Sequence, residues 1–260
     1  LYVLDSAAWQ TFRKAAESSE PVKLNLTESR WYQILHGLCY LHFITGNRSL
    51  SCSVPPEIRT VYDSLVTDGL IQRKKHYDQL HLYALAAANL YGVISQDDFV
   101  ALFNSQNEDN TSKEELFDAL IRHIVVDAGY CFWDKYIVDI GFEDNGFADV
   151  SDLLAQIGDK PRYIPEKEEF LKYADWRYFE HNEHSRNLGD YLIHACGVAP
   201  LLVPKIVTEL HESCMLSESF QNRFDLLAEH GIEFDGDQLN EFIRLLSAFD
   251  NSTRLWSNNG

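Results

Sequence analysis

The stretch LYGVISQDDFVALFN, residues 90–104, contains the local signals for the end of one helix and the start of the next. Gly92 can adopt the left-handed conformation that stops a helix over about residues 77–91. Ser95, followed by Asp98 three residues later, is typical of a helix N-terminus. Apolar side chains at helical spacing then form one face of the second helix: Phe99, Leu102 and Phe103. The stretch therefore predicts two helices joined by a tight turn.

The following residues repeat this pattern and add a hairpin. Ser112 and Glu115 predict the start of a third helix. Its apolar stripe consists of Leu116, Leu120, Ile121 and Ile124. The sequence YCFWDKYIVD, residues 130–139, holds two short aromatic and β-branched runs around a central turn, which predicts a β-hairpin. Three helices followed by a hairpin is the element order of a winged helix, so we expect a winged-helix-like unit over residues 71–145.

Residues 1–70 predict a small unit of helices and a strand. Residues 27–44 begin with Thr27 at a helix N-cap and continue with apolar side chains at helical spacing. The sequence SLSCSV, residues 49–54, alternates as an exposed strand does. Two prolines then end the strand and open a new helix at about Glu57.

Residues 146–260 predict an acidic, all-helical domain. Residues 145–165 form a linker region with proline stops and one short helix. The helices expected after it cover residues 166–184, 186–196, 200–214, 217–230 and 237–250. The chain carries a net charge of −18, of which residues 141–260 contribute −12, from 10 basic and 22 acidic groups. The fold class we expect is mainly α with a minor β part.

A helix that reads DNA needs cationic and amide side chains near its N-terminus, with more cations to hold phosphates. The third helix, SKEELFDALIRHIVVD over residues 112–127, instead carries two basic and four acidic side chains. The densest basic run, Arg73, Lys74 and Lys75, is either a phosphate-binding patch or a solvated loop before the first helix. The charge therefore favours a winged helix that contacts proteins. A nucleic-acid-associated regulator is the alternative.

The sequence FEHNEHSRN, residues 179–187, brings carboxylates and imidazoles close together along the chain. Its candidate metal ligands are Glu180, His181, Glu183 and His184. The spacing matches neither HExxH nor HxxEH, because position 177 is arginine, so a solvated polar helix end is the competing interpretation. The chain also lacks GxGxxG, GxxxxGK[ST] and GxSxG motifs. We therefore expect no cofactor and no catalytic residue, and a metal-dependent enzyme is the third hypothesis.

The sequence YADWRYFE, residues 173–180, is unusually aromatic. We expect it to pack its helix against a neighbouring unit, and in the alternative Trp176 and Tyr178 stay exposed for a partner.

Three stretches carry a resemblance to known proteins: LYGVISQDDFVALFN, YIPEKEEFLKYADWRYFE and FDNSTRLWSNNG. Together they resemble a group of cytoplasmic proteins from Gram-positive (Firmicute) bacteria. The resemblance implies no particular activity. Some members of the group carry a SEC-C-type zinc module or a Rho-N-terminal-like module outside the region seen here, so no zinc ligands are carried over.

The last of these stretches matches the most distinctive motif of the group. The matching positions are Asn251, Thr253, Arg254 and Trp256. They form either a docking site for a partner or a terminal cap, in which Trp256 packs on the helical bundle and Arg254 pairs with an acidic neighbour.

The chain starts at Leu1 without a basic and apolar leader, and its five cysteines contain no CxxC pair. The longest stretch without Asp, Glu, Lys or Arg is too polar for a membrane span. We therefore expect a cytoplasmic protein that contacts no membrane and was trimmed from a longer sequence. The function we expect is that of a non-enzymatic interaction or regulatory protein whose partners are other proteins.

Overall fold

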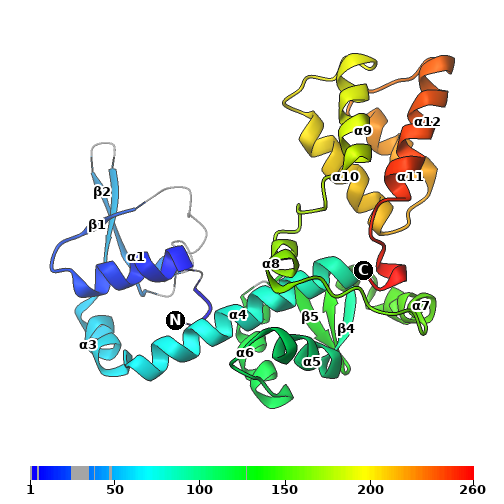
Figure 1. Ribbon diagram of the computed structural model, residues 1–260. Coiled ribbons are helices and arrows are strands. Elements are labelled where there is room, and N and C mark those ends of the chain that lie inside the picture. Colours follow the sequence, from blue (N-terminus) through cyan, green and yellow to red (C-terminus); the bar gives the residue numbers. More distant parts are fainter. Residues whose placement is uncertain (1, 5, 25–34, 38, 47–48, 127) are drawn as a thin grey trace. The chain divides into compact units, whose positions relative to one another are not determined.

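A computed structural model describes the chain except for residues 1, 5, 25–34, 38, 47–48 and 127 (Figure 1). The described residues are mainly helical and include two small antiparallel sheets of three strands each. They divide into two compact units. Unit 1 consists of Leu1–His81 and Asp118–Val126, and unit 2 of Leu82–Phe117 and Asp127–Gly260. The boundaries predicted at residues 70 and 145 stay predictions.

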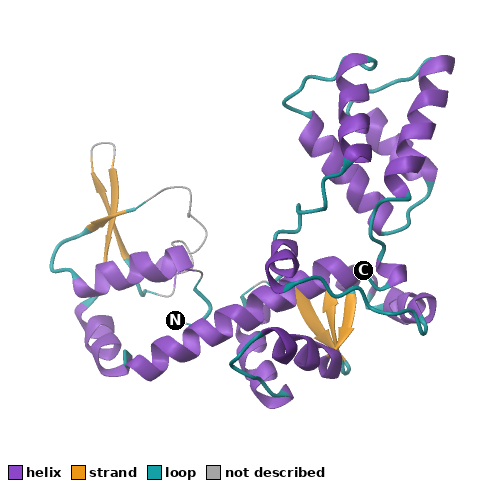
Figure 2. Ribbon diagram, in the orientation of Figure 1, coloured by secondary structure: helices purple, strands orange, loops and turns teal. Residues whose placement is uncertain are grey.

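Unit 1 combines helices with the first sheet (Figure 2). Its elements are α1 (Ser6–Glu17), β1 (Val22–Lys23), β2 (His42–Gly46), β3 (Ser49–Ser53), α3 (Pro56–Leu65), the first part of α4 (Asp68–Tyr91) and the last part of α6 (Lys113–Val125). The strand order is β1-β3-β2, and Phe43 pairs with Cys52. Apolar side chains such as Phe12, Leu41 and Tyr62 form its core.

The structure confirms the strand in SLSCSV and the helix after the prolines, but it corrects the helix over 27–44. Residues 42–44 belong to β2, because this end of the segment pairs with β3 residue by residue. Thr27 and most of the rest of that segment lie outside the described residues. Residues 35–37 are helical as predicted, so pairing with β3 overrides the predicted helix only at residues 42–44.

The first part of unit 2 follows the predicted order closely. Its elements are the end of α4, β4 (Val93–Ser95), α5 (Gln96–Gln106), the start of α6, β5 (Tyr130–Trp133) and β6 (Tyr136–Asp139). Gly92 has a φ of 70°, and the Ser95 hydroxyl accepts the Asp98 backbone N–H at 3.1 Å, as predicted. The sequence did not predict β4, which joins the hairpin to give the sheet order β4-β6-β5.

The middle of unit 2 is less helical than predicted. It contains η2 (Ile140–Asn145), α7 (Ala148–Ile157), α8 (Lys167–Phe170) and η3 (Leu171–Ala174). The helix predicted over 166–184 is wrong beyond Ala174. The Asp175 side chain accepts the Arg177 backbone N–H there, and Asn182 caps the next helix, so both side chains hold the chain in turns.

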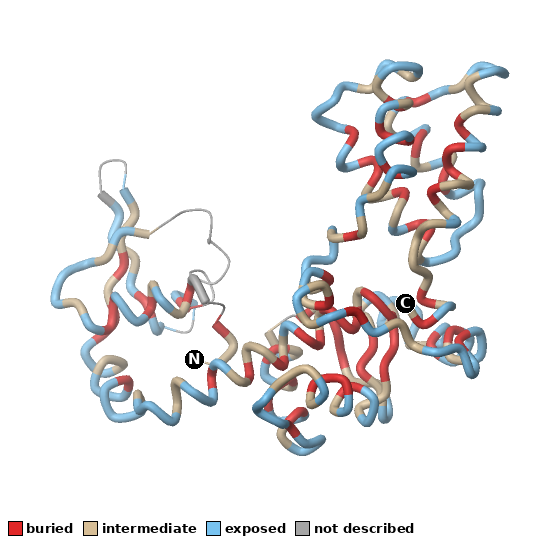
Figure 3. The backbone as a smooth tube through the Cα atoms, viewed as in Figure 1, coloured by how far each residue is buried: buried red, intermediate tan, exposed pale blue. Residues whose placement is uncertain are grey.

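The end of unit 2 is a helical bundle, as expected. Its helices are α9 (Glu183–His194), α10 (Val203–Met215), α11 (Phe220–Glu229) and α12 (Gly236–Asp250), and η4 (Trp256–Asn258) follows them. Its core is formed by buried residues, most of them on α9, α10 and α12. Buried positions are red in Figure 3. No helix among the described residues is long and apolar enough to cross a membrane.

Candidate functional site

The C-terminal motif folds back onto unit 2 through Trp256. The indole is 9% exposed, and its Nε1 donates to the Asn89 carbonyl oxygen at 2.9 Å. The ring lies so close to Gly92 that a Cβ at this position would be 2.4 Å from it. Trp256 therefore packs against the end of α4 rather than on the helical bundle, and Gly92 is required both for its φ and for this contact.

Arg254 lies in a polar cluster beside this anchor. Its guanidinium donates to Glu180 Oε1 at 3.0 and 3.1 Å and lies 3.3 Å from the centre of the Tyr163 ring. The Arg254 and Glu180 side chains are 30% and 37% exposed. The pairing with an acidic neighbour that the capping interpretation requires is therefore present. Of the other motif residues, Thr253 donates to the Phe249 carbonyl oxygen at 3.0 Å, and Asn251 is exposed at the end of α12.

Residues of the aromatic stretch lie near the same polar cluster, because Tyr173 and Tyr178 are both close to Glu180. Tyr173 and Phe179 are buried, and the Tyr178 hydroxyl donates to Glu169. Burial and this hydrogen bond raise the pKa of Tyr178, as do the charges of Glu169 and Glu180. Trp176 alone of these four is exposed, at 64%. Tyr178 and Arg254 thus both lie near Glu180, while Trp176 stays available to a partner.

The four candidate metal ligands do not converge. Glu180 is used by Arg254, and the His181 ring contacts Phe179 at a centroid distance of 4.3 Å. Glu183 and His184 are exposed in the first turn of α9. Within the described residues, no three His, Cys, Asp or Glu side chains are placed to hold a metal ion.

The basic run before residue 76 lies inside α4, not in a loop, and Lys74 points inward. Lys74 is 2% exposed, and its Nζ donates to the Leu4 carbonyl oxygen at 2.5 Å and to Asp78 at 2.8 Å. Arg73 and Lys75 are exposed. The run therefore offers two accessible cations rather than three, because Lys74 is buried and its ammonium donates to groups within the protein.

The start of α6 is acidic and apolar on its surface. Lys113 forms an ion pair with Asp97 at 2.5 Å. Hydrogen bonds from the Glu114 backbone N–H and from the Ser112 side chain lower the pKa of the Glu114 carboxyl. Phe117 is 49% exposed, and its ring stacks on Phe132 of the hairpin at 5.3 Å. The helix that would enter a DNA groove thus begins with a neutralised lysine and an ionised glutamate.

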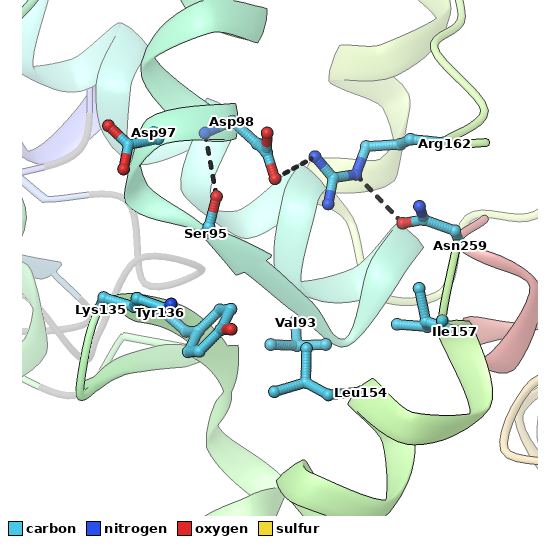
Figure 4. Close-up of a pocket in the computed structure, with 11 residues that line it drawn as sticks. Val93, Ser95, Asp97, Asp98, Lys135, Tyr136, Leu154, Ile157, Arg162 and Asn259 are labelled. Carbon is cyan, nitrogen blue, oxygen red and sulfur yellow. Dashed lines mark hydrogen bonds and ion pairs between the residues drawn. The ribbon is translucent and has the colours of Figure 1, made fainter. Parts of the chain in front are cut away.

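A cavity of about 390 Å³ lies beside the end of the chain (Figure 4). Its lining includes the apolar residues Val93, Leu154 and Ile157. The Arg162 guanidinium lies between Asp98 and Asn259, at 3.1 Å from each, as Figure 4 shows. These three residues come from distant parts of the chain, so nothing local in the sequence identified the cavity. Because Asp98 neutralises Arg162, the lining has no unbalanced charge at this point.

Comparisons with protein-family models, curated proteins and solved structures find no match to this chain. The resemblance to the Firmicute group therefore stays a prediction. The start of α6 combines an exposed aromatic side chain, Phe117, with acidic residues in its first turn.

Proposed function

We propose that the protein is a non-enzymatic cytoplasmic interaction or regulatory protein that uses a winged-helix-like scaffold to contact other proteins. The chain order α4, β4, α5, α6, β5 and β6 supports the winged-helix part. The antiparallel sheet order β4-β6-β5, which joins the first strand to the hairpin, supports it too. The cytoplasmic location and the kinship with the Firmicute group belong to the same proposal.

The observation that carries the proposal is the surface at the start of α6. Phe117, which is 49% exposed, stacks on the partly buried Phe132, and Glu114 keeps a negative charge three residues before Phe117 on α6. Aromatic side chains supply much of the binding energy of protein interfaces, whereas phosphate backbones require cations. This surface suits a protein partner better than DNA.

Nucleic-acid binding is the competing function, and its cations would be Arg73 and Lys75. Each phosphate contact adds to both the affinity and the salt dependence of binding. With Lys74 buried, the run supplies few such contacts. We therefore expect no binding to a mixed pool of DNA and RNA at low salt. Salt-dependent binding that is lost in a variant with Arg73→Ala and Lys75→Ala would overturn the proposal.

The direct test places a photoreactive phenylalanine analogue at position 117. We expect this protein to form discrete crosslinks to a protein partner in cells of its source, and excess unmodified protein to suppress them. The same analogue at Gln156, an exposed position on α7, serves as the control and should not give these products. Crosslinks that are identical from both positions would contradict a specific role for the α6 surface.

A further inference from the structure

The corner between α10 and α11 leaves two large apolar side chains at the surface. Leu216 and Phe220 are each 41% exposed. They lie at the two ends of a three-residue turn, residues 217–219, in which Ser217 has a φ of 57°. One face of the Phe220 ring is covered by the Arg223 guanidinium at 5.1 Å. The tight turn keeps both apolar side chains at one corner of the bundle.

Carboxylates surround this corner. Glu209 and Glu212 on α10 and Leu216, the C-cap that follows it, are three and four residues apart, which puts them on one side of the helix. Glu218 lies in the turn and accepts the Ser213 hydroxyl at 2.8 Å. Burial raises the pKa of Glu212, and so do the negative charges of Glu218 and Glu209. These three carboxylates are therefore close enough to repel one another.

The bundle has few cations to offset this charge. Residues 183–250 contain 12 acidic and four basic side chains, a net charge of −8. Three of the four cations already have acidic partners within the bundle: Arg223 with Asp250, Arg244 with Glu241, and Lys205 with Glu209. Glu209 also binds His230 at 2.6 Å. The charge at the corner thus stays largely uncompensated around Glu212 and Glu218.

We propose that this acidic and apolar corner binds a basic amphipathic segment of a partner protein. Its apolar side chains would cover Leu216 and Phe220, and its lysines or arginines would lie between Glu212 and Glu218. A second copy of this chain is disfavoured as the occupant, because its net charge of −18 would meet like charge. The inference rests on the proposed function, since it names the chemistry of a partner for the helical bundle.

The test uses a fluorescein-labelled 14-residue helical peptide of leucine and lysine as the probe. Its binding to the whole 260-residue chain is followed by fluorescence anisotropy at low and moderate salt. The variants are Leu216→Ser with Phe220→Ser, and Glu212→Gln alone. The matched controls are Leu201→Ser, a leucine that is 90% exposed just before α10, and Asp237→Asn in the first turn of α12. Each control makes the same chemical change away from the corner.

We expect the double variant to raise the dissociation constant about tenfold and Glu212→Gln about threefold, since each removes part of the contact. Both controls should change it less than twofold. The single variant Leu216→Ser, at an exposed position outside the core, keeps the test valid if the double variant fails to fold. Equal weakening by variants and controls would show general attraction to an acidic protein and overturn the inference, as would an absence of binding. Neither result affects crosslinking from position 117, so the two proposals fail separately.

Discussion

Unit 1 buries charged and polar side chains, whereas the C-terminal motif of unit 2, residues 251–256, leaves its ion pair partly exposed. In unit 1, buried Lys74 is held by Asp78 and the Leu4 carbonyl oxygen, and the rings of His81 and His123 stack at 3.8 Å. In unit 2, the C-terminal motif buries the apolar ring of Trp256 and leaves the charges of Arg254 and Glu180 about one third exposed.

The difference has a consequence for stability. A buried charged group needs its hydrogen-bond partners, because burial has already removed its water. If a partner is lost, nothing compensates for that desolvation. A partly exposed ion pair can return to water when it breaks. Unit 1 should therefore be sensitive to single polar substitutions and to acid, whereas the C-terminal motif of unit 2 should depend mainly on its tryptophan.

The largest effect is expected for Trp256→Ala in unit 2. Removing a buried aromatic side chain leaves a cavity and should lower the free energy of unfolding by about 3–5 kcal/mol. Chemical denaturation, with hydrogen exchange at the end of α4, measures this. The control is Trp176→Ala, which removes an indole that is 64% exposed and should change stability by less than about 0.5 kcal/mol. Equal effects of the two substitutions would show that Trp256 is not the anchor.

In unit 1, Lys74→Ala should have the next largest effect. It removes the ammonium group that donates to the Leu4 carbonyl oxygen and to the Asp78 carboxylate, and it should cost about 2–4 kcal/mol. Hydrogen exchange in the first half of α4 reports this loss within unit 1. Arg73→Ala, at the preceding exposed position, should stay within about 0.5 kcal/mol. If Arg73→Ala proves as costly, the burial of Lys74 does not explain its role.

Acid should destabilise unit 1 through its stacked histidines. Burial, with the nearby Lys74 charge, lowers the pKa of His81 to about 4, and burial, with His81 and Lys74, lowers that of His123 to about 3. The unfolded chain takes up these protons near pH 6.5 and the folded chain does not. The free energy of unfolding therefore keeps its full value above pH 6.5. It falls by about 1–3 kcal/mol as the pH drops toward 4.

The check is hydrogen exchange in α4 at several pH values. Each measured rate is corrected for the intrinsic exchange rate at that pH. His123→Leu should flatten the pH dependence, because it removes one titrating ring from the stack. His184→Leu, which changes an exposed histidine at the start of α9, should leave the dependence as it is. A slope that survives in His123→Leu would assign the acid sensitivity to other groups.

The smallest effect is expected for Arg254→Gln. Its ion pair with Glu180 is partly exposed, so the substitution should cost about 1 kcal/mol or less. Measurement of the unfolding free energy at low and high salt tests this, since added salt should reduce the difference from the unsubstituted chain. A cost as large as that of Lys74→Ala would remove the contrast between the two clusters.

Local sequence signals predicted much of the helical framework. The glycine stop at Gly92 and the Ser95 cap lie within a few residues of the groups they act on, so their effects follow from spacing alone. The hairpin and the four bundle helices followed for the same reason. Strand β4 was missed, because the signals around Gly92 and Ser95 predicted only a tight turn, and these three residues form a strand through pairing with the distant β6.

The predictions for the functional sites were less accurate, because the positions of these side chains depend on partners far away in the sequence. The run at residues 73–75 looks uniformly exposed in the sequence, but the backbone of Leu4 and the side chain of Asp78 bury its middle residue. The cluster at residues 180–184 looks compact in the sequence, but Glu180 forms an ion pair with the distant Arg254. Sequence spacing shows which side chains are available, but it does not show which distant groups will bind them.

The sequence by itself therefore determined the acidic charge. It also determined most of the helices, several of their caps and the hairpin, because these elements depend on neighbours within one or two turns. Only the tertiary structure decided that Trp256 is an internal anchor, that Lys74 is buried, and that Phe117 and Leu216 remain at the surface. The physical reason is desolvation, because whether a side chain loses its water depends on segments far away in the sequence, as Asn89 is from Trp256.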